Sequence, residues 1–156
     1  MGEALVRIPL SPRSGCECGS VSVSVGGNFQ CSMFNVQCSM FDFEKLEVYQ
    51  VVKNQNVKAL TYLTKATDLD FYIRDQWKRA SLSILTNLAE GTGRMSTQDK
   101  KHYYTMARGS VFECTAILDL LHEMKLVEDT FYEDIYSGYE QCSKMLLAMY
   151  RSMDKQ

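Results

Sequence analysis

Proline is missing from most of this sequence, and its absence is compatible with long helices. Both prolines, Pro9 and Pro12, lie near the N-terminus of the 156-residue chain, so the stretch from Met40 to Gln156 contains none. Proline breaks or kinks a helix interior, and this stretch is free of that constraint. The chain also has no apolar run long enough to span a membrane and no apolar leader followed by a small-residue cleavage site. We therefore expect a soluble, cytoplasmic protein.

Catalytic and metal-binding motifs are missing as well. The sequence has no G-x-S-x-G, H-E-x-x-H or Walker motif. Its two histidines, His102 and His122, are isolated, and neither follows a glutamate by three positions, which is the spacing found in di-iron bundles. We expect no catalytic residues, no cofactor and no metal.

The six cysteines do not follow the spacing of a structural zinc site. The N-terminal group has no paired C-x2-C motif and no histidine nearby; its members are Cys16, Cys18, Cys31 and Cys38. We expect reduced thiols there. Cys114 and Cys142 fall on apolar helical stripes, where a thiol behaves as a small buried hydrophobe.

A tandem repeat sets the N-terminal segment apart. Residues 28–34 read NFQCSMF and residues 35–41 read NVQCSMF, with one difference between the copies. The preceding VSVSVGG alternates like a strand, so a short β-hairpin or regulatory tail from Val21 is one interpretation. The composition favours another, in which residues 1–39 are a disordered extension or lie upstream of a true start at Met40. We expect an N-terminal extension over 1–39 and one domain over 40–156.

Four segments of this domain carry helical periodicity, the first of them from about Asp42 to Ala66. Its stripe is interrupted by Asn54, Gln55 and Asn56. Its core candidates are Phe43, Leu46, Val51, Val52, Ala59, Leu60 and Leu63. The polar link TDLD over 67–70 supplies capping residues for a second helix, with core candidates Ile73, Trp77, Ala80, Ile84 and Leu88.

The third and fourth segments alternate spacings of three and four without a break. The third has Tyr104, Ala107, Val111, Cys114, Leu118 and Leu121, and the fourth has Ile135, Tyr139, Cys142, Leu146, Met149 and Met153. Ser96 with Asp99, and Thr130 with Glu133, predict the caps that start these two helices. This pattern is typical of helices packed at a shallow angle, so we predict an all-α, antiparallel up-and-down four-helix bundle.

The stretch NLAEGTGR over 87–94 is compatible with either a phosphate loop or a helix corner. No strand pattern precedes it and no G-K-[ST] ending follows, which favours the corner. In that interpretation Gly91 closes the second helix in the left-handed conformation, Gly93 relaxes the turn and Met95 packs ahead of the next cap. Gly109, inside the third helix, predicts close helix approach, with Asn87 hydrogen-bonded in a tight hairpin of the second and third helices.

The charges are almost balanced, with 17 basic and 19 acidic residues and a formal net charge of −2. No global attraction to nucleic acid follows from this balance. Cations are nevertheless concentrated around the second and third helices, and we expect a basic zone at their corner that contacts nucleic acid or another partner through Arg74, Lys78, Arg79, Arg94, Lys100, Lys101 and Arg108. The alternative is that these are solvated residues, or partners of Glu90 and Glu113 in structural ion pairs.

Two runs carry a resemblance to a known family. The run QWKRASLSILTNLAEGTGR over 76–94 and the run YYTMARGSVFE over 103–113 resemble the doubled motif of the 23S rRNA intervening-sequence proteins, a bacterial four-helix-bundle family. The matching residues are Gln76, Arg79, Ala80, Asn87, Ala89, Glu90, Gly91, Gly93, Arg94, Tyr103, Ala107, Arg108, Gly109, Ser110 and Glu113. The resemblance extends from Phe41 to about Tyr150.

The resemblance implies a ring-like homopentamer with no known catalytic activity. Genes of this family were recognised within insertions in ribosomal RNA genes, which implies RNA or a ribonucleoprotein, such as the ribosome, as the leading partner. A related group, the accessory variability proteins of diversity-generating retroelements, forms similar pentamers and binds reverse transcriptase and nucleic acid. We expect a non-enzymatic homo-oligomeric scaffold that binds RNA; the alternative is a protein-only adaptor, such as an accessory subunit to a reverse transcriptase.

Overall fold

The computed structural model describes residues 21–22, 30–31 and 41–155. Two short strands, β1 (Val21–Ser22) and β2 (Gln30–Cys31), pair antiparallel, with Val21 opposite Cys31. The four strand residues lie in the first of the two units into which the chain divides. Most of the tandem repeat lies outside the described residues, and so do the other positions for which predictions were made in the N-terminal segment.

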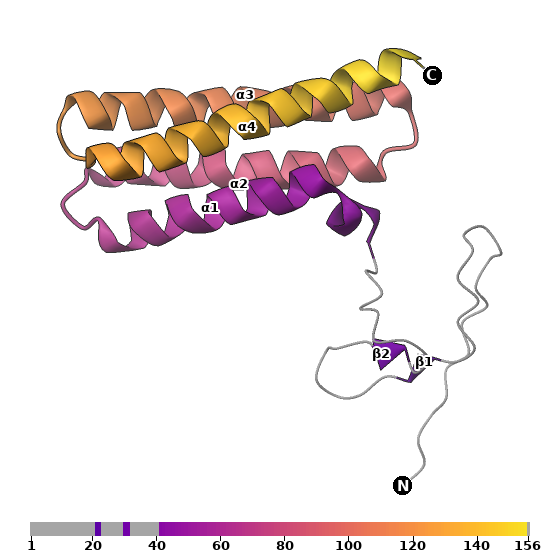
Figure 1. Ribbon diagram of the computed structural model, residues 1–156, viewed down its shortest axis with the longest axis horizontal. Coiled ribbons are helices and arrows are strands. Elements are labelled where there is room, and N and C mark those ends of the chain that lie inside the picture. Colours follow the sequence, from indigo (N-terminus) through magenta and orange to yellow (C-terminus); the bar gives the residue numbers. More distant parts are fainter. Residues whose placement is uncertain (1–20, 23–29, 32–40, 156) are drawn as a thin grey trace, which may run out of the picture. The chain divides into compact units, whose positions relative to one another are not determined.

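The second unit, residues 39–156, contains four long helices. They follow a short 3-10 helix, η1 (Asp42–Lys45), and a 3-10 turn, η2 (Met153–Lys155), comes after them. The helices are α1 (Glu47–Lys65), α2 (Phe71–Gly93), α3 (Thr97–Glu123) and α4 (Asp129–Ser152). Consecutive helices run antiparallel and pack side by side, and α1 also packs against α4, so that the four close around one core (Figure 1). The predicted four-helix bundle is confirmed.

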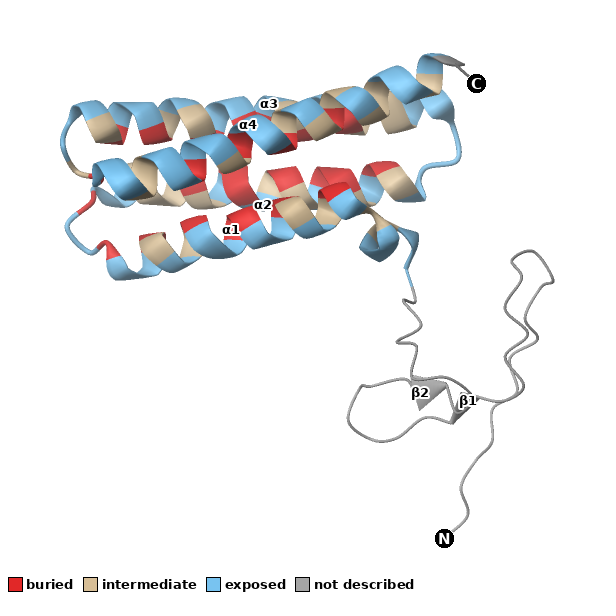
Figure 2. Cartoon of the chain, in the orientation of Figure 1, coloured by how far each residue is buried: buried red, intermediate tan, exposed pale blue. Residues whose placement is uncertain are grey.

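The core lies along the facing sides of the helices (Figure 2). All six apolar positions predicted for α3 are buried, as are Trp77, Ala80, Ile84 and Leu88 on α2 and Ile135, Tyr139, Cys142 and Leu146 on α4. The Trp77 Nε1 donates a hydrogen bond to Tyr139 Oη at 2.9 Å, and both side chains are completely buried. Burial raises the pKa of Tyr139, because a phenolate would be desolvated there.

The first helix differs from its prediction in two ways. The segment is not continuous, because Leu46 is extended between η1 and α1. Gln55 and Asn56, expected to interrupt the stripe, are buried within it. The Gln55 Nε2 donates to the carbonyl of Ile135 at 2.8 Å, and the Asn56 Nδ2 donates to the carbonyl of Ser81 at 2.5 Å. The two amides therefore join α1 to both of its neighbours.

The helix caps confirm two predictions and correct a third. Asp70, in the predicted link, accepts from the backbone N–H groups of Tyr72 and Ile73 at the start of α2. The Ser96 hydroxyl accepts from the backbone N–H of Asp99 at 3.4 Å, as expected for the start of α3. The cap predicted at Thr130 is wrong, because α4 begins at Asp129 with Glu128 as its N-cap and no side-chain cap. A backbone turn fixes this start instead: Lys125 has a φ of 58°, and Val127 is buried in the link.

Candidate interaction surfaces

A line of polar contacts runs between α2 and α3 and includes four residues of the family-like motif: Gln76, Asn87, Ser110 and Glu113. The Gln76 amide donates to the Glu113 carboxylate, and the hydroxyls of Ser83 and Ser110 lie 2.8 Å apart. The Asn87 Nδ2 donates to the Ser83 carbonyl at 2.8 Å and to its hydroxyl at 2.9 Å. Both Asn87 hydrogen bonds therefore lie within α2, and it is Ser83 that makes the contact with α3.

The glycines of the motif have roles different from those predicted. Gly91 is buried inside α2, which continues to Gly93, so its predicted left-handed helix end is wrong. Its missing side chain instead admits the Tyr104 ring, whose Cε1 lies 2.8 Å from where a Cβ would stand. A Cβ built on Gly93 or on Gly109 would meet no heavy atom within 4 Å. Gly109 is therefore not a point of close helix approach within the bundle. Met95 is 98% exposed and does not pack ahead of the cap.

The corner between α2 and α3 carries three of the predicted cations. The Arg94 guanidinium lies over the Tyr103 ring, 4.5 Å from its centroid, and its Nη2 is 3.4 Å from Glu90 Oε2. Lys101 pairs with Asp154 and lies over the Tyr150 ring. Lys100, half-buried, has no ion pair or hydrogen bond among the described residues.

The other four cations do not join this corner. Arg74 and Arg94 are 20 positions apart on α2, which at 1.5 Å per residue corresponds to about 30 Å. Arg74 donates to the carbonyl of Ala66, and Arg79 pairs with Asp75 at 2.7 Å. Lys78 shares their half of α2. Arg108 donates to the Ser143 hydroxyl at 3.2 Å and covers the Phe112 ring. The seven cations thus fall into separate groups rather than one zone.

Exposed apolar side chains form a feature that the sequence predictions missed. On α3, Phe112 and Leu120 are each 52% exposed, and on α1 and α2, Val57 and Leu82 are 58% and 50% exposed. The signal was present in the sequence, because Phe112, Ala116 and Leu120 recur at spacings of four on the side of the helix away from the core stripe. These side chains lie outside the core of the single chain.

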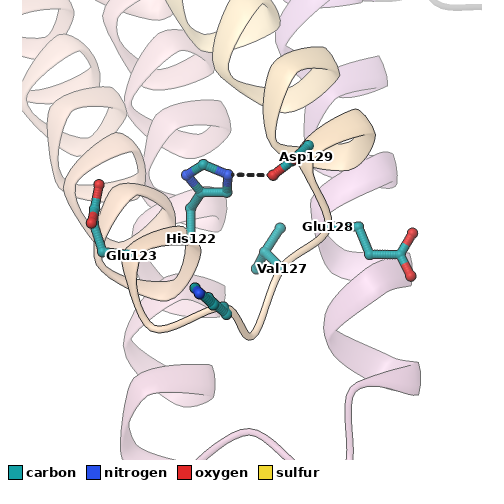
Figure 3. Close-up of a pocket in the computed structure, with 6 residues that line it drawn as sticks. His122, Glu123, Val127, Glu128 and Asp129 are labelled. Atoms are coloured by element: carbon teal, nitrogen blue, oxygen red, sulfur yellow. Dashed lines mark hydrogen bonds and ion pairs between the residues drawn. The ribbon is translucent and has the colours of Figure 1, made fainter.

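An open pocket of about 550 Å³ lies at the α3–α4 corner (Figure 3). The His122 Nε2 is 2.9 Å from Asp129 Oδ1, and the His122 ring stacks on Tyr132 with centroids 4.0 Å apart. Tyr132 also donates to Asp119, a hydrogen bond that raises the pKa of its phenol to about 12. Over the part of the chain that the structure describes, no group of three or more His, Cys, Asp or Glu is arranged to hold a metal ion.

The fold is that of an antiparallel four-helix bundle, and polar contacts of the family-like motif lie between α2 and α3. The family model described as "23S rRNA-intervening sequence protein" matches residues 44–148, and the chain belongs to this family. A crystal structure of a protein of unknown function from the S23 ribosomal protein family of Bacteroides thetaiotaomicron VPI-5482 has the same fold. The two are 20% identical with a TM-score of 0.63, over 66% of this chain and 97% of the other. No curated protein matches the chain.

Within the described residues, no helix is both long and apolar enough to cross a membrane.

Proposed function

We propose that the protein is a non-catalytic scaffold that assembles with copies of itself and binds RNA at the α2–α3 corner. The observation that carries the self-association is the pair of exposed apolar faces on α3 and on α1–α2. Residues such as Phe112 and Val57, each more than half exposed, would be covered in an assembly, where burial of apolar area is favourable.

The corner supports the RNA part of the proposal. Arg94 stacked on Tyr103 presents a planar cation and an aromatic ring together, the combination that contacts phosphates and stacks on unpaired bases. Lys100 adds a cation with no partner among the described residues. In an assembly this corner recurs once per copy, so weak contacts act together on one RNA molecule.

A protein-only adaptor is the second candidate, such as an accessory subunit to a reverse transcriptase. The ion pairs favour it: Glu90 and Asp154 already balance Arg94 and Lys101. A charge-balanced surface attracts phosphate weakly and suits a polar protein partner better.

RNA binding separates the two candidates. Fluorescence anisotropy with a labelled RNA hairpin carrying a single-stranded loop is measured as a function of salt for the full chain and two triple variants. Arg94→Gln/Lys100→Gln/Lys101→Gln neutralises the corner, and Lys65→Gln/Lys125→Gln/Lys144→Gln removes the same charge elsewhere. We expect salt-dependent binding that only the corner variant weakens, with a log–log salt slope smaller by about 2 for the loss of three single-strand phosphate contacts. Equal effects of both variants, or no binding by the wild type, would favour the adaptor.

A further inference from the structure

We infer that the 3-10 turn η2 is a removable cover on the α2–α3 corner, whose Asp154 carboxylate holds Lys101 until an RNA phosphate displaces it. The inference rests on the proposed RNA binding at this corner and adds a means by which that binding is restrained. A carboxylate can take the place of a phosphate here, because both anions accept charge-assisted hydrogen bonds from a lysine ammonium through their oxygen atoms.

Lys101 is far less exposed than the neighbouring cation Arg94. The Lys101 side chain is 15% exposed, against 45% for that of Arg94. Two groups that come late in the chain surround it. The Tyr150 ring centroid on α4 lies 4.8 Å from Lys101 Nζ, and the Asp154 carboxylate of η2 pairs with the same nitrogen. A phosphate therefore reaches this ammonium only when Asp154 has moved away.

The Lys101–Asp154 pair joins distant segments, whereas the Arg94 pair is local. Glu90 and Arg94 are four positions apart on α2, so their pair moves with the helix. Lys101 lies near the start of α3, and Asp154 follows it by 53 positions, at the end of the bundle where α3 begins (Figure 1). This pair opens when η2 moves, without a change inside α3 or α4. It is therefore the one of the two that can act as a switch.

Few contacts hold η2 in place. The backbone N–H of Met153 bonds to the carbonyls of Arg151 and Tyr150, which belong to the turn just before it. The Met153 side chain is half-buried against the core. Hydrogen bonds of 3-10 turns have poorer geometry than those of α-helices, and an ion pair with a solvent-exposed member adds little stability. Phosphate contacts of RNA can therefore displace the turn at a small cost in free energy.

The open corner would present two similar contact points for RNA. Tyr150 belongs to α4 and stays in place when η2 moves, so that Lys101 remains beside its ring. Arg94 lies over the Tyr103 ring in the same way. Each pair combines a cation for phosphate with an aromatic ring on which an unpaired base can stack. The position of η2 thus decides whether one or both pairs are accessible.

The test measures RNA binding by full-length Asp154→Asn, using fluorescence anisotropy with the same labelled hairpin. Glu140→Gln is the matched control, because it removes one carboxylate from an exposed ion pair with Lys144 on α4. We expect Asp154→Asn to tighten RNA binding by about fivefold, the equivalent of opening one such ion pair, and Glu140→Gln to change it little. In a Lys101→Gln background, Asp154→Asn should have no effect, because the lysine that it uncovers is gone.

Lysine reactivity measures the cover without RNA. Acetic anhydride acetylates accessible amines, and mass spectrometry of the digested protein gives the rate at each lysine. Lys101 in the wild type should react more slowly than Lys144, whose side chain is 71% exposed. Asp154→Asn should raise the rate at Lys101 by about fivefold and leave the rate at Lys144 unchanged.

The outcomes separate the cover from the proposed function. RNA binding that is equally tight in the wild type and Asp154→Asn, or tightened equally by Glu140→Gln, contradicts the cover and leaves the proposed RNA binding intact. An unchanged acetylation rate at Lys101 also contradicts the cover. If neither the wild type nor Asp154→Asn binds RNA, the cover and the proposed function are both wrong. Far-UV circular dichroism verifies that each variant keeps its helices.

Discussion

Gly91 and Tyr104 are in direct contact across the α2–α3 pair, and the contact depends on the absence of a side chain on the glycine. A Cβ at Gly91 would lie 2.8 Å from Tyr104 Cε1 and 2.9 Å from Tyr103 Cβ, closer than carbon atoms pack. Tyr104 is itself buried, at 2% exposure, so its ring has little freedom to withdraw. The glycine of the corner motif is therefore a packing residue.

Gly91→Ala is expected to lower the free energy of unfolding by about 1–3 kcal/mol through overpacking. Gly93→Ala is the matched control, because a Cβ there meets nothing within 4 Å and alanine favours the helix by less than about 1 kcal/mol. Urea denaturation measures both. Equal stability of the two variants would contradict the packing role of Gly91.

The bond between Trp77 and Tyr139 gives a second prediction. Tyr139→Phe removes the acceptor of a completely buried indole N–H, which should cost about 1–3 kcal/mol of unfolding free energy. Trp77 is the only tryptophan, so its fluorescence reports unfolding of the core. Tyr136→Phe, at a position 41% exposed, is the control and should change stability little.

Gly138 and Gln55 are expected to be energetically coupled. A Cβ on Gly138 would overlap the Gln55 amide and displace it from its hydrogen bond to Ile135. Gly138→Ala should therefore destabilise the wild type by about 1–3 kcal/mol, the cost of an unpaired buried polar group. In a Gln55→Ala background the same change should be neutral or stabilising, because alanine is favoured over glycine in a helix. A double-mutant cycle without coupling would contradict this contact.

The buried thiols predict a loss of stability at alkaline pH. Burial raises the pKa of Cys114 to about 11 and that of Cys142 to about 12, from an ordinary value of 9.0. Above pH 9 the unfolded chain releases these protons and the folded chain keeps them, so stability should fall as pH rises through this range. Cys114→Ala/Cys142→Ala should show a shallower decline in urea denaturation between pH 8 and pH 10. An unchanged slope would indicate that other groups control it.

Gly109→Leu tests whether this glycine matters to folding or to association. Nothing lies within 4 Å of a Cβ there, so the side chain enters solvent and the helices should form unchanged, as judged by far-UV circular dichroism. If the exposed side of α3 that carries Gly109 and Phe112 is covered in the proposed self-association, the larger residue should raise the dissociation constant of the oligomer by about tenfold in dilution experiments. Gly109→Ala, with its smaller side chain, should have a weaker effect.

The bundle itself was predictable because its signals are local and repeated. The stripe from Tyr104 to Leu121 on α3 places an apolar residue every three or four positions, and every one of them is buried. The corner was placed correctly for a similar reason, since Ser96 caps the nearest helix start. Gln55 and Asn56 were wrongly expected to interrupt the buried stripe of the first helix. Their amides are buried because carbonyl groups of other helices accept their hydrogen bonds. The sequence does not show which helices supply these acceptors.

The grouping of the predicted cations could not be predicted from the sequence. Arg74 and Arg94 carry the same charge and belong to the same helical segment of the sequence. Helix geometry nevertheless separates them by about 30 Å along α2. Lys101 gained a partner, Asp154, from the far end of the chain.

The sequence by itself determined the helices, their order and the family, because periodicity, caps and motif residues act over a few positions. Only the tertiary structure decided that Gly91 admits a tyrosine ring, that Gly109 faces outward and that Phe112, Leu120, Val57 and Leu82 remain uncovered. These facts depend on which helices become neighbours, and helix neighbours are set by packing between segments far apart in the chain.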